Sequence, residues 1–300
     1  MHKERVLITG ASGFIGSHLI KYLLSKDYAV IGLSRQSGRT SSHPDLTWVQ
    51  RLDELKTDQI DYVINLAGES IGKGRWTAQR KQQLIQSRVQ TTQNLYSYLE
   101  RRRIAPKCII SGSAVGYYGI DPEEKWQQPC TEDSPPQPIF QSELCQQWEQ
   151  AARQFPQQNT KIIRLGIVFA AKGGILPQML MPIRMNLIGR IGHGRQPVVW
   201  VHIRDVLRGI EFLMTRPTEA KVFNLTAPGS VPQAQFAELA ARQLKKRPLL
   251  CMPAFVFKCL LGEQSQLLLN GQYVKPQALT EAGFSFEFPA MKEALADVLG

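Results

Sequence analysis

The sequence predicts an α/β fold: a Rossmann-type doubly wound parallel sheet with a smaller carboxyl-terminal lobe. Up to about residue 170, short β-rich runs alternate with longer amphipathic runs. This alternation is typical of parallel strands joined by right-handed crossovers. The strand runs are continuously apolar, as expected for strands covered on both faces. A glycine-rich turn, residues 10–16, joins the first strand to the first helix.

Each expected element follows from its own residues. Strands are predicted where β-branched and other apolar residues cluster, at residues 5–9, 29–34, 47–50, 62–67, 107–111, 161–169, 198–202 and 222–225. Helices are predicted where apolar residues recur every three to four positions, at 14–25, 77–103, 142–154 and 205–214. After Gly173, Gly174 and Pro177 the pattern loosens, and from residue 231 it is mostly helical.

The composition argues against a nucleic-acid-binding protein and against a metal site. The 300 residues include 36 Lys and Arg against 25 Asp and Glu, a net charge of +11 that favours anionic partners such as phosphorylated cofactors. The basic runs 101–103 and 245–247 are expected on solvated helix ends, and no recognition motif indicates nucleic acid. Five cysteines without a C-x-x-C pair indicate reduced thiols and no metal site.

The sequence also indicates where the protein is located and how it assembles. No apolar run reaches membrane-spanning length, and a strand begins almost at once at Val6. We therefore expect a cytoplasmic protein with no membrane partner, present as a monomer or homodimer.

The turn at residues 10–16 has the spacing expected of a dinucleotide site. Gly10 permits a tight turn, Gly13 lets the backbone approach a pyrophosphate, and Gly16 lets the helix pack on the strand. Ser12, Phe14 and Ile15 lie within this unit, at the amino end of the helix, where free N–H groups favour phosphate.

The end of the second strand indicates which dinucleotide is bound. NAD sites usually place an acidic residue there, but no carboxylate occurs between Asp27 and Asp45. Ser34, Arg35 and Arg39 stand there instead, and a guanidinium can bind a 2′-phosphate in bidentate geometry. The sequence therefore predicts NADP as the cofactor.

Two further strand ends are expected to line the cofactor. Small residues after the strand 62–67 allow close approach of a ribose and nicotinamide, and Ser111 ends the next strand; the expected contacts are Leu66, Ala67, Gly68, Glu69 and Ser111. We thus expect residues 1–170 to form an NADP-binding Rossmann domain, with 198–226 returning to its sheet. Residues 171–197 and 227–300 would form a small substrate-side lobe.

The chain resembles an atypical extended short-chain dehydrogenase/reductase, of the nucleoside-diphosphate-sugar epimerase branch with a DUF1731-type carboxyl end. The resemblance covers essentially the whole chain and is carried by the glycine turn and by the motifs NLAGES (65–70), SGSAVGYYG (111–119), RLGIVF (164–169), HIRDV (202–206) and LTEAGF (279–284). It implies a Rossmann domain, a small substrate lobe and NADP binding, but no particular substrate.

One departure from the family puts turnover in doubt. Relatives use a Tyr-x-x-x-Lys pair, in which the tyrosine transfers the proton. If the corresponding helix is aligned with the family through Glu149, Gln141 stands in place of the tyrosine and Cys145 in place of the lysine. If it is aligned through Leu144, Ile139 and Glu143 stand in these places. Neither alignment supplies tyrosine or lysine.

Other groups are therefore candidates for the chemistry. Ser113 matches the family serine, Tyr117 offers a phenol, and Cys145 offers a thiol that Arg88 could activate. Lys73, Arg75 and Arg88 are expected to hold an anionic substrate, with His202 at the cleft or in a structural role. We expect an NADP-dependent oxidoreductase or epimerase acting on a small polar, anionic substrate. The alternative is an inactive NADPH-binding sensor or regulator.

Overall fold

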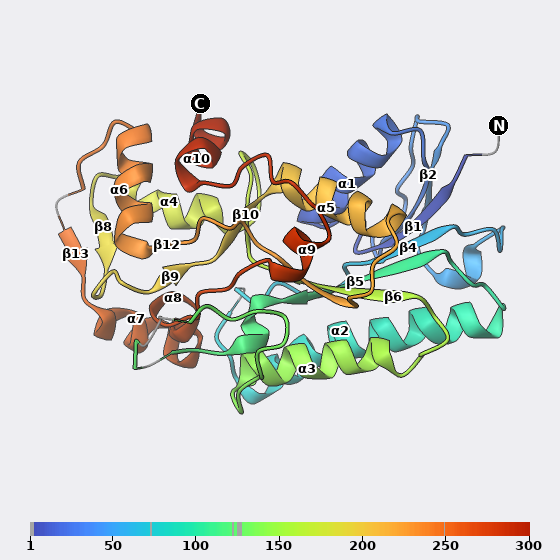
Figure 1. The fold of residues 1–300 in the computed structure, drawn as a ribbon, viewed down its shortest axis with the longest axis horizontal. Coiled ribbons are helices and arrows are strands. Elements are labelled where there is room, and N and C mark those ends of the chain that lie inside the picture. Colours follow the sequence, from blue (N-terminus) through green and yellow to red (C-terminus); the bar gives the residue numbers. More distant parts are fainter. Residues whose placement is uncertain (1–2, 73, 122, 125–127, 249) are drawn as a thin grey trace.

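The computed structural model describes residues 3–72, 74–121, 123–124, 128–248 and 250–300. Its centre is a seven-stranded sheet in the order β11-β6-β5-β4-β1-β2-β3, with every neighbouring pair parallel (Figure 1). The strands are β1 (Arg5–Thr9), β2 (Ala29–Leu33), β3 (Leu46–Val49), β4 (Tyr62–Asn65), β5 (Cys108–Ala114), β6 (Thr160–Leu165) and β11 (Val222–Leu225). The predicted doubly wound α/β fold is confirmed.

Helices cover both faces of the sheet. In Figure 1, α1 (Phe14–Ser25) and α5 (Ile203–Thr215) lie above it, and α2 (Ala78–Arg101) and α3 (Phe140–Arg153) lie below it. Alternate residues of β1 face the two helical layers. Val6 and Ile8 pack in the buried cluster that contains α1 and α5, and Leu7 packs in the cluster that contains α2. This explains why β1 is apolar at consecutive positions.

The winding direction reverses between β1 and β4. The chain runs from β1 outward to β2 and β3, then starts the other half of the sheet at β4, which pairs with β1 on its other side. Ligands of such sheets bind in the crevice at the carboxyl ends of the strands where this reversal occurs. The glycine turn follows β1 directly and therefore lies at this crevice.

One predicted strand proves to be two. Residues 161–169 were expected to be continuous, but β6 ends at Leu165 and β7 (Ile167–Phe169) pairs with β10 (Trp200–His202) in a separate sheet. Gly166 divides them, at a point where a Cβ would lie only 3.0 Å from the Val199 carbonyl oxygen. Between residues 198 and 226, only β11 joins the seven-stranded sheet, because β9 (Pro197–Val198) pairs with β12 (Val231–Pro232).

Several of the remaining elements gather at the end of the molecule opposite the amino terminus (Figure 1). Here α4 (Leu176–Arg184), α6 (Gln233–Gln243) and α10 (Met291–Leu299) enclose a second apolar core, and β8 (Ile188–Ile191) pairs with β13 (Leu250–Met252). The short elements η1 (Leu52–Glu54), η2 (Val115–Tyr118), α7 (Ala254–Leu261), η3 (Gly262–Ser265), α8 (Gln266–Leu269) and α9 (Gln277–Glu281) complete the structure. No helix among the described residues has the length and apolar character needed to cross a membrane.

Candidate nucleotide-binding site

The glycine turn leaves no room for side chains. Gly10 has φ +67°, and a Cβ there would lie 2.7 Å from the Leu66 carbonyl oxygen. A Cβ on Gly16 would overlap the Gly10 carbonyl oxygen and lie 2.8 Å from that of Ala11. The turn after β1 therefore packs directly against the backbone after β4 and against its own helix.

The amino end of α1 is free to accept an anion. Gly13 is the N-cap, no side chain caps the helix, and its first turn holds no acidic residue. Unpaired N–H groups with the positive end of the helix dipole favour phosphate at this position. The Phe14 ring beside them packs under Gly173 and Gly174, whose φ angles of +85° and +67° carry the loop before α4 across it. Ile15 is half-buried in the same first turn.

The predicted 2′-phosphate residues lie just beyond β2. Ser34 is buried and donates a hydrogen bond to the Ser12 hydroxyl (2.9 Å), which ties this strand end to the glycine turn. The Arg35 side chain is 88% exposed, with Nη1 3.9 Å from Glu69 Oε1. The Arg39 guanidinium packs over the Trp48 ring and donates to the Gln36 amide oxygen. Both guanidinium groups are thus at the surface, where a phosphate can reach them.

A buried polar network fixes the ends of β1, β4 and β5. Asn65 accepts a hydrogen bond from the Thr9 hydroxyl (2.7 Å) and donates to Thr92 (2.8 Å) and to Ser111 (3.3 Å). Thr9 also accepts a bond from the Ala67 amide (3.2 Å). The network brings Ser111 and Ala67 together, as the sequence predicted. Sequence reasoning missed Thr9 and Thr92, although two threonines facing a buried asparagine are a recognisable signal once the strand order is known.

Arg88 lies beside the loop after β4 and keeps its charge unpaired. Its guanidinium donates to the carbonyl oxygens of Leu84 (3.0 Å) and Glu69 (2.8 Å) and lies over the Trp148 ring, and a Cβ on Gly68 would touch it. Burial lowers its pKa. The Glu69 carboxylate pairs with Arg80 instead. Within the described residues no carboxylate forms an ion pair with Arg88, so its charge is available to a bound anion.

Ser113 belongs to a buried charged cluster on β5, α3 and β6. Its hydroxyl donates to Glu149 Oε1 (2.8 Å), and Arg164 donates to both oxygens of the same carboxylate (2.7 and 2.9 Å). Arg164 also donates to the hydroxyl of Tyr118 (2.9 Å). The buried Arg164 charge is therefore paired with Glu149, which also holds Ser113 in one orientation.

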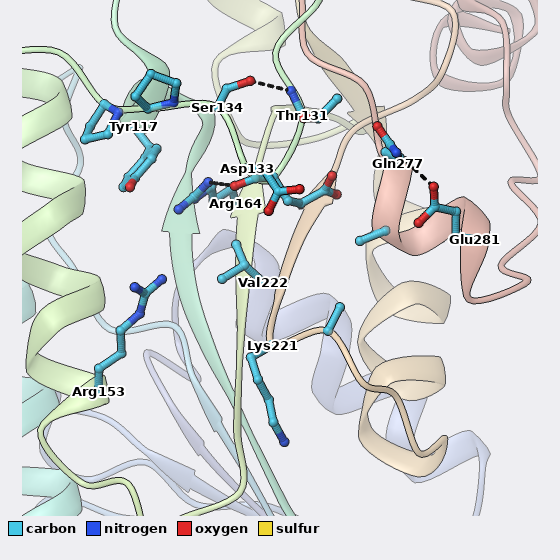
Figure 2. Close-up of a pocket in the computed structure, with 15 residues that line it drawn as sticks. Tyr117, Thr131, Asp133, Ser134, Arg153, Arg164, Lys221, Val222, Gln277 and Glu281 are labelled. Atoms are coloured by element: carbon cyan, nitrogen blue, oxygen red, sulfur yellow. Dashed lines mark hydrogen bonds between the residues drawn. The ribbon is translucent and has the colours of Figure 1, made fainter.

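Tyr117 faces away from the glycine turn. Its ring lies 3.4 Å from the Arg164 guanidinium and lines a cleft of about 600 Å³. Figure 2 shows this cleft between α3, the loop at residues 131–136, the start of β11 and α9. None of the residues predicted to hold the cofactor lines it.

Gln141 and Cys145 lie one turn apart on α3 and both approach Gly116, which follows β5. Gln141 is 3% exposed, and its Oε1 accepts no hydrogen bond from any residue that the structure describes. Burial, together with the Glu149 charge, raises the pKa of the Cys145 thiol to about 11. The thiol is therefore protonated at neutral pH, and activation by Arg88 is not supported.

Two of the other predicted substrate residues, Arg75 and His202, lie in a loop and at the end of a strand, respectively. Arg75 donates to the Cys259 carbonyl oxygen (2.8 Å), which links the loop before α2 to α7, and Lys73 lies outside the described residues. His202 is 1% exposed, caps α5 through Nδ1, and packs against Phe288. Burial lowers its pKa and keeps the ring neutral. Its Nε2 lies 3.2 Å from Asp297 Oδ2. These contacts favour the structural role that the sequence also allowed, and we leave His202 out of the substrate site proposed below.

Comparison with known proteins now assigns the family. Residues 6–226 match the model of the NAD dependent epimerase/dehydratase family, and residues 252–298 match a domain of unknown function, DUF1731. The chain belongs to the NAD dependent epimerase/dehydratase family. The expected resemblance is confirmed, and membership places this chain among proteins that use a nicotinamide cofactor.

Relatives align with this epimerase-family chain along its full length. An epimerase family protein of Staphylococcus saprophyticus is 38% identical and one of Staphylococcus epidermidis 36% identical, each alignment covering 99% of both chains. The crystal structure of the human epimerase family protein SDR39U1 with NADPH superposes with a TM-score of 0.87 at 31% identity, covering 98% of this chain and 99% of that one. A nucleoside-diphosphate sugar epimerase from Corynebacterium glutamicum shares the fold, with a TM-score of 0.76 at 24% identity over 100% of this chain and 59% of its own.

Proposed function

We propose that the protein binds NADP(H) and acts as an oxidoreductase or epimerase on a small polar, anionic substrate. The observation that carries the proposal is the glycine turn, in which Gly10 and Gly16 leave no space for a Cβ, together with two surface guanidinium groups beyond β2. The human relative named above was crystallised with NADPH, which supports the same cofactor here.

Different groups of residues would bind different parts of the cofactor. The turn Gly10–Gly16 and the open end of α1 suit the pyrophosphate, and Arg35 and Arg39 suit the 2′-phosphate. Leu66 to Glu69 and Ser111 would border the nicotinamide half. When bound, the cofactor supplies or accepts a hydride, and the protein's own task is to orient the substrate and manage its proton.

Arg88 is the group best placed to hold an anionic substrate. Its charge is unpaired by any carboxylate in the described structure, and it lies against Gly68, beside the residues proposed for the nicotinamide half. A carboxylate or phosphate would compensate the charge that burial disfavours. Arg75 could assist from the loop before α2. Ser113, held by Glu149, can still accept a hydrogen bond and so orient a substrate hydroxyl.

The positions of the family's Tyr-x-x-x-Lys pair hold neither tyrosine nor lysine in this chain, and this supports a second candidate function. Gln141 cannot ionise, and the Cys145 thiol is buried and protonated. Tyr117 lines a cleft that none of the proposed cofactor residues line, so a water relayed through Ser113 would have to replace the customary tyrosine. The alternative is a protein that binds NADPH as a sensor or regulator and has lost turnover.

One experiment separates the two functions. The NADPH complex is mixed with a panel of small carbonyl compounds rich in keto acids, and the reduced-nicotinamide absorbance is followed. We expect oxidation with at least one anionic carbonyl compound and a loss of about tenfold or more in kcat/KM for Arg88→Met, since a charge-assisted bond contributes about 1.5–3 kcal/mol. Tight binding without oxidation across the panel would favour the sensor, and no binding would refute both.

We also carry forward the predicted organisation. Residues 1–170, with the returning segment 198–226, are proposed as the NADP-binding domain, and residues 171–197 and 227–300 as the substrate-side lobe. A cytoplasmic monomer or homodimer is proposed with them.

A further inference from the structure

Exposed apolar side chains are concentrated at one end of the molecule. The large apolar residues that are exposed in the described structure are Met181, Met185, Leu187, Leu250 and Phe255, with exposed fractions of 43–66%. All five fall within two segments, residues 176–195 and 239–262. Scattered single residues of this kind are normal on protein surfaces, but a concentration of them marks an interaction site.

Backbone pairing brings the two segments together. Met181 lies on α4, Met185 is the C-cap of that helix, and Leu187 follows. The Leu250 amide donates to the Leu187 carbonyl oxygen (3.0 Å), and β8 pairs with β13 immediately beyond. In Figure 1, β8 and β13 lie at the left end of the molecule, with α4 and α7 next to them. We call the five side chains the apolar tip.

The same two segments contain no acidic residue. Residues 176–195 and 239–262 hold no Asp or Glu, and their basic residues are Arg184, Arg190, Arg195, Arg242, Lys245, Lys246, Arg247 and Lys258. Arg195 pairs with Glu124 and Arg242 with Glu238. Lys245, Lys246 and Arg247 are exposed and form no ion pair with any described residue. In the other basic run, by contrast, Arg101 pairs with Asp53 and Arg102 with Asp58.

We propose that the apolar tip docks peripherally on an anionic lipid bilayer. Unpaired basic side chains around exposed Met, Leu and Phe suit the interface between phosphate headgroups and acyl chains. A second copy of the chain would present the same positive charge and be repelled, which disfavours self-association through this surface. The sequence led us to expect no membrane partner because it has no spanning segment, but interfacial binding requires none.

Vesicle binding tests the proposal. The full-length chain is centrifuged with phosphatidylcholine vesicles that contain or lack about one quarter phosphatidylglycerol. We expect binding only to the anionic vesicles, weakened by salt. Lys245→Glu/Lys246→Glu should weaken it at least about tenfold, because each basic residue near such a surface contributes roughly 1 kcal/mol. Met185→Ser/Leu250→Ser should weaken it severalfold.

A matched variant distinguishes a local surface from net charge. Lys21→Glu/Lys26→Glu makes the same change in charge on an exposed residue of α1 and on its exposed C-cap, away from the tip, and should leave vesicle binding unchanged. The proposal is overturned if anionic vesicles are not bound, or if both charge variants lose binding equally. It is also overturned if the serine variant keeps full binding and polyglutamate competes as well as vesicles do, which would indicate an acidic protein partner. These outcomes do not depend on catalysis, so they are separable from the proposed oxidoreductase function.

Discussion

Gly16→Ala is expected to weaken NADPH binding about a hundredfold. A Cβ at this position would overlap the Gly10 carbonyl oxygen and lie 2.8 Å from that of Ala11. Both are backbone atoms, so α1 has to move away from the turn, and displacements near 1 Å cost factors of about 100 at precisely positioned sites. Isothermal titration with NADPH measures the loss.

The control for this variant is Gly72→Ala. Gly72 lies in the loop after β4, and the nearest atom to its Cβ would be 3.9 Å away, an ordinary contact. This variant should bind NADPH as the wild type does. If Gly16→Ala also binds within twofold of the wild type while remaining folded by circular dichroism, the glycine turn does not hold the cofactor.

Glu149→Ala is expected to lower the free energy of unfolding by about 3–5 kcal/mol. Glu149 and Arg164 are only 3% and 2% exposed, and the carboxylate accepts two hydrogen bonds from the guanidinium and one from Ser113. Its removal leaves the Arg164 charge buried without a counter-ion. Chemical denaturation of the purified protein measures the change.

Two further variants test the explanation. Glu143→Ala removes an exposed carboxylate from the first turn of the same helix and should cost about 1 kcal/mol or less. Glu149→Ala/Arg164→Met should recover part of the lost stability, because the uncompensated charge is removed as well. A loss for Glu149→Ala no larger than that for Glu143→Ala would show that the pair is not a structural centre.

The sequence predicted the nucleotide-binding half well because its signals are local. The helix at 14–25 and the strand at 222–225 match the structure at both ends, and β1 likewise spans residues 5–9. The features that set the ends of such elements, namely an apolar run, a glycine turn or a short connection, all lie within about 20 residues of one another in the sequence. The gathering of Ser34, Ala67 and Ser111 followed from parallel strand order, which places carboxyl ends at one edge.

What could not be predicted depends on contacts distant in sequence. Apolar residues stand on both sides of Gly166 in the run 161–169, so nothing in the composition shows that Gly166 passes the chain from one sheet to another. The partner of Arg164 lies 15 residues away on α3, the helix that lacks the tyrosine and lysine of the family. The burial that keeps Cys145 protonated, and the packing of His202 against Phe288, likewise arise only when α3 and the carboxyl-terminal segment have docked.

The cofactor preference is the central claim, and the dissociation constants of NADPH and NADH for the wild type and Arg35→Asp test it most directly. A charge-assisted bond contributes about 1.5–3 kcal/mol, so Arg35→Asp should weaken NADPH roughly 10- to 100-fold and NADH by less than about threefold. Arg51→Asp, an exposed arginine after β3, should change neither. Equal losses for the two nucleotides in Arg35→Asp, or tighter binding of NADH by the wild type, would contradict the account.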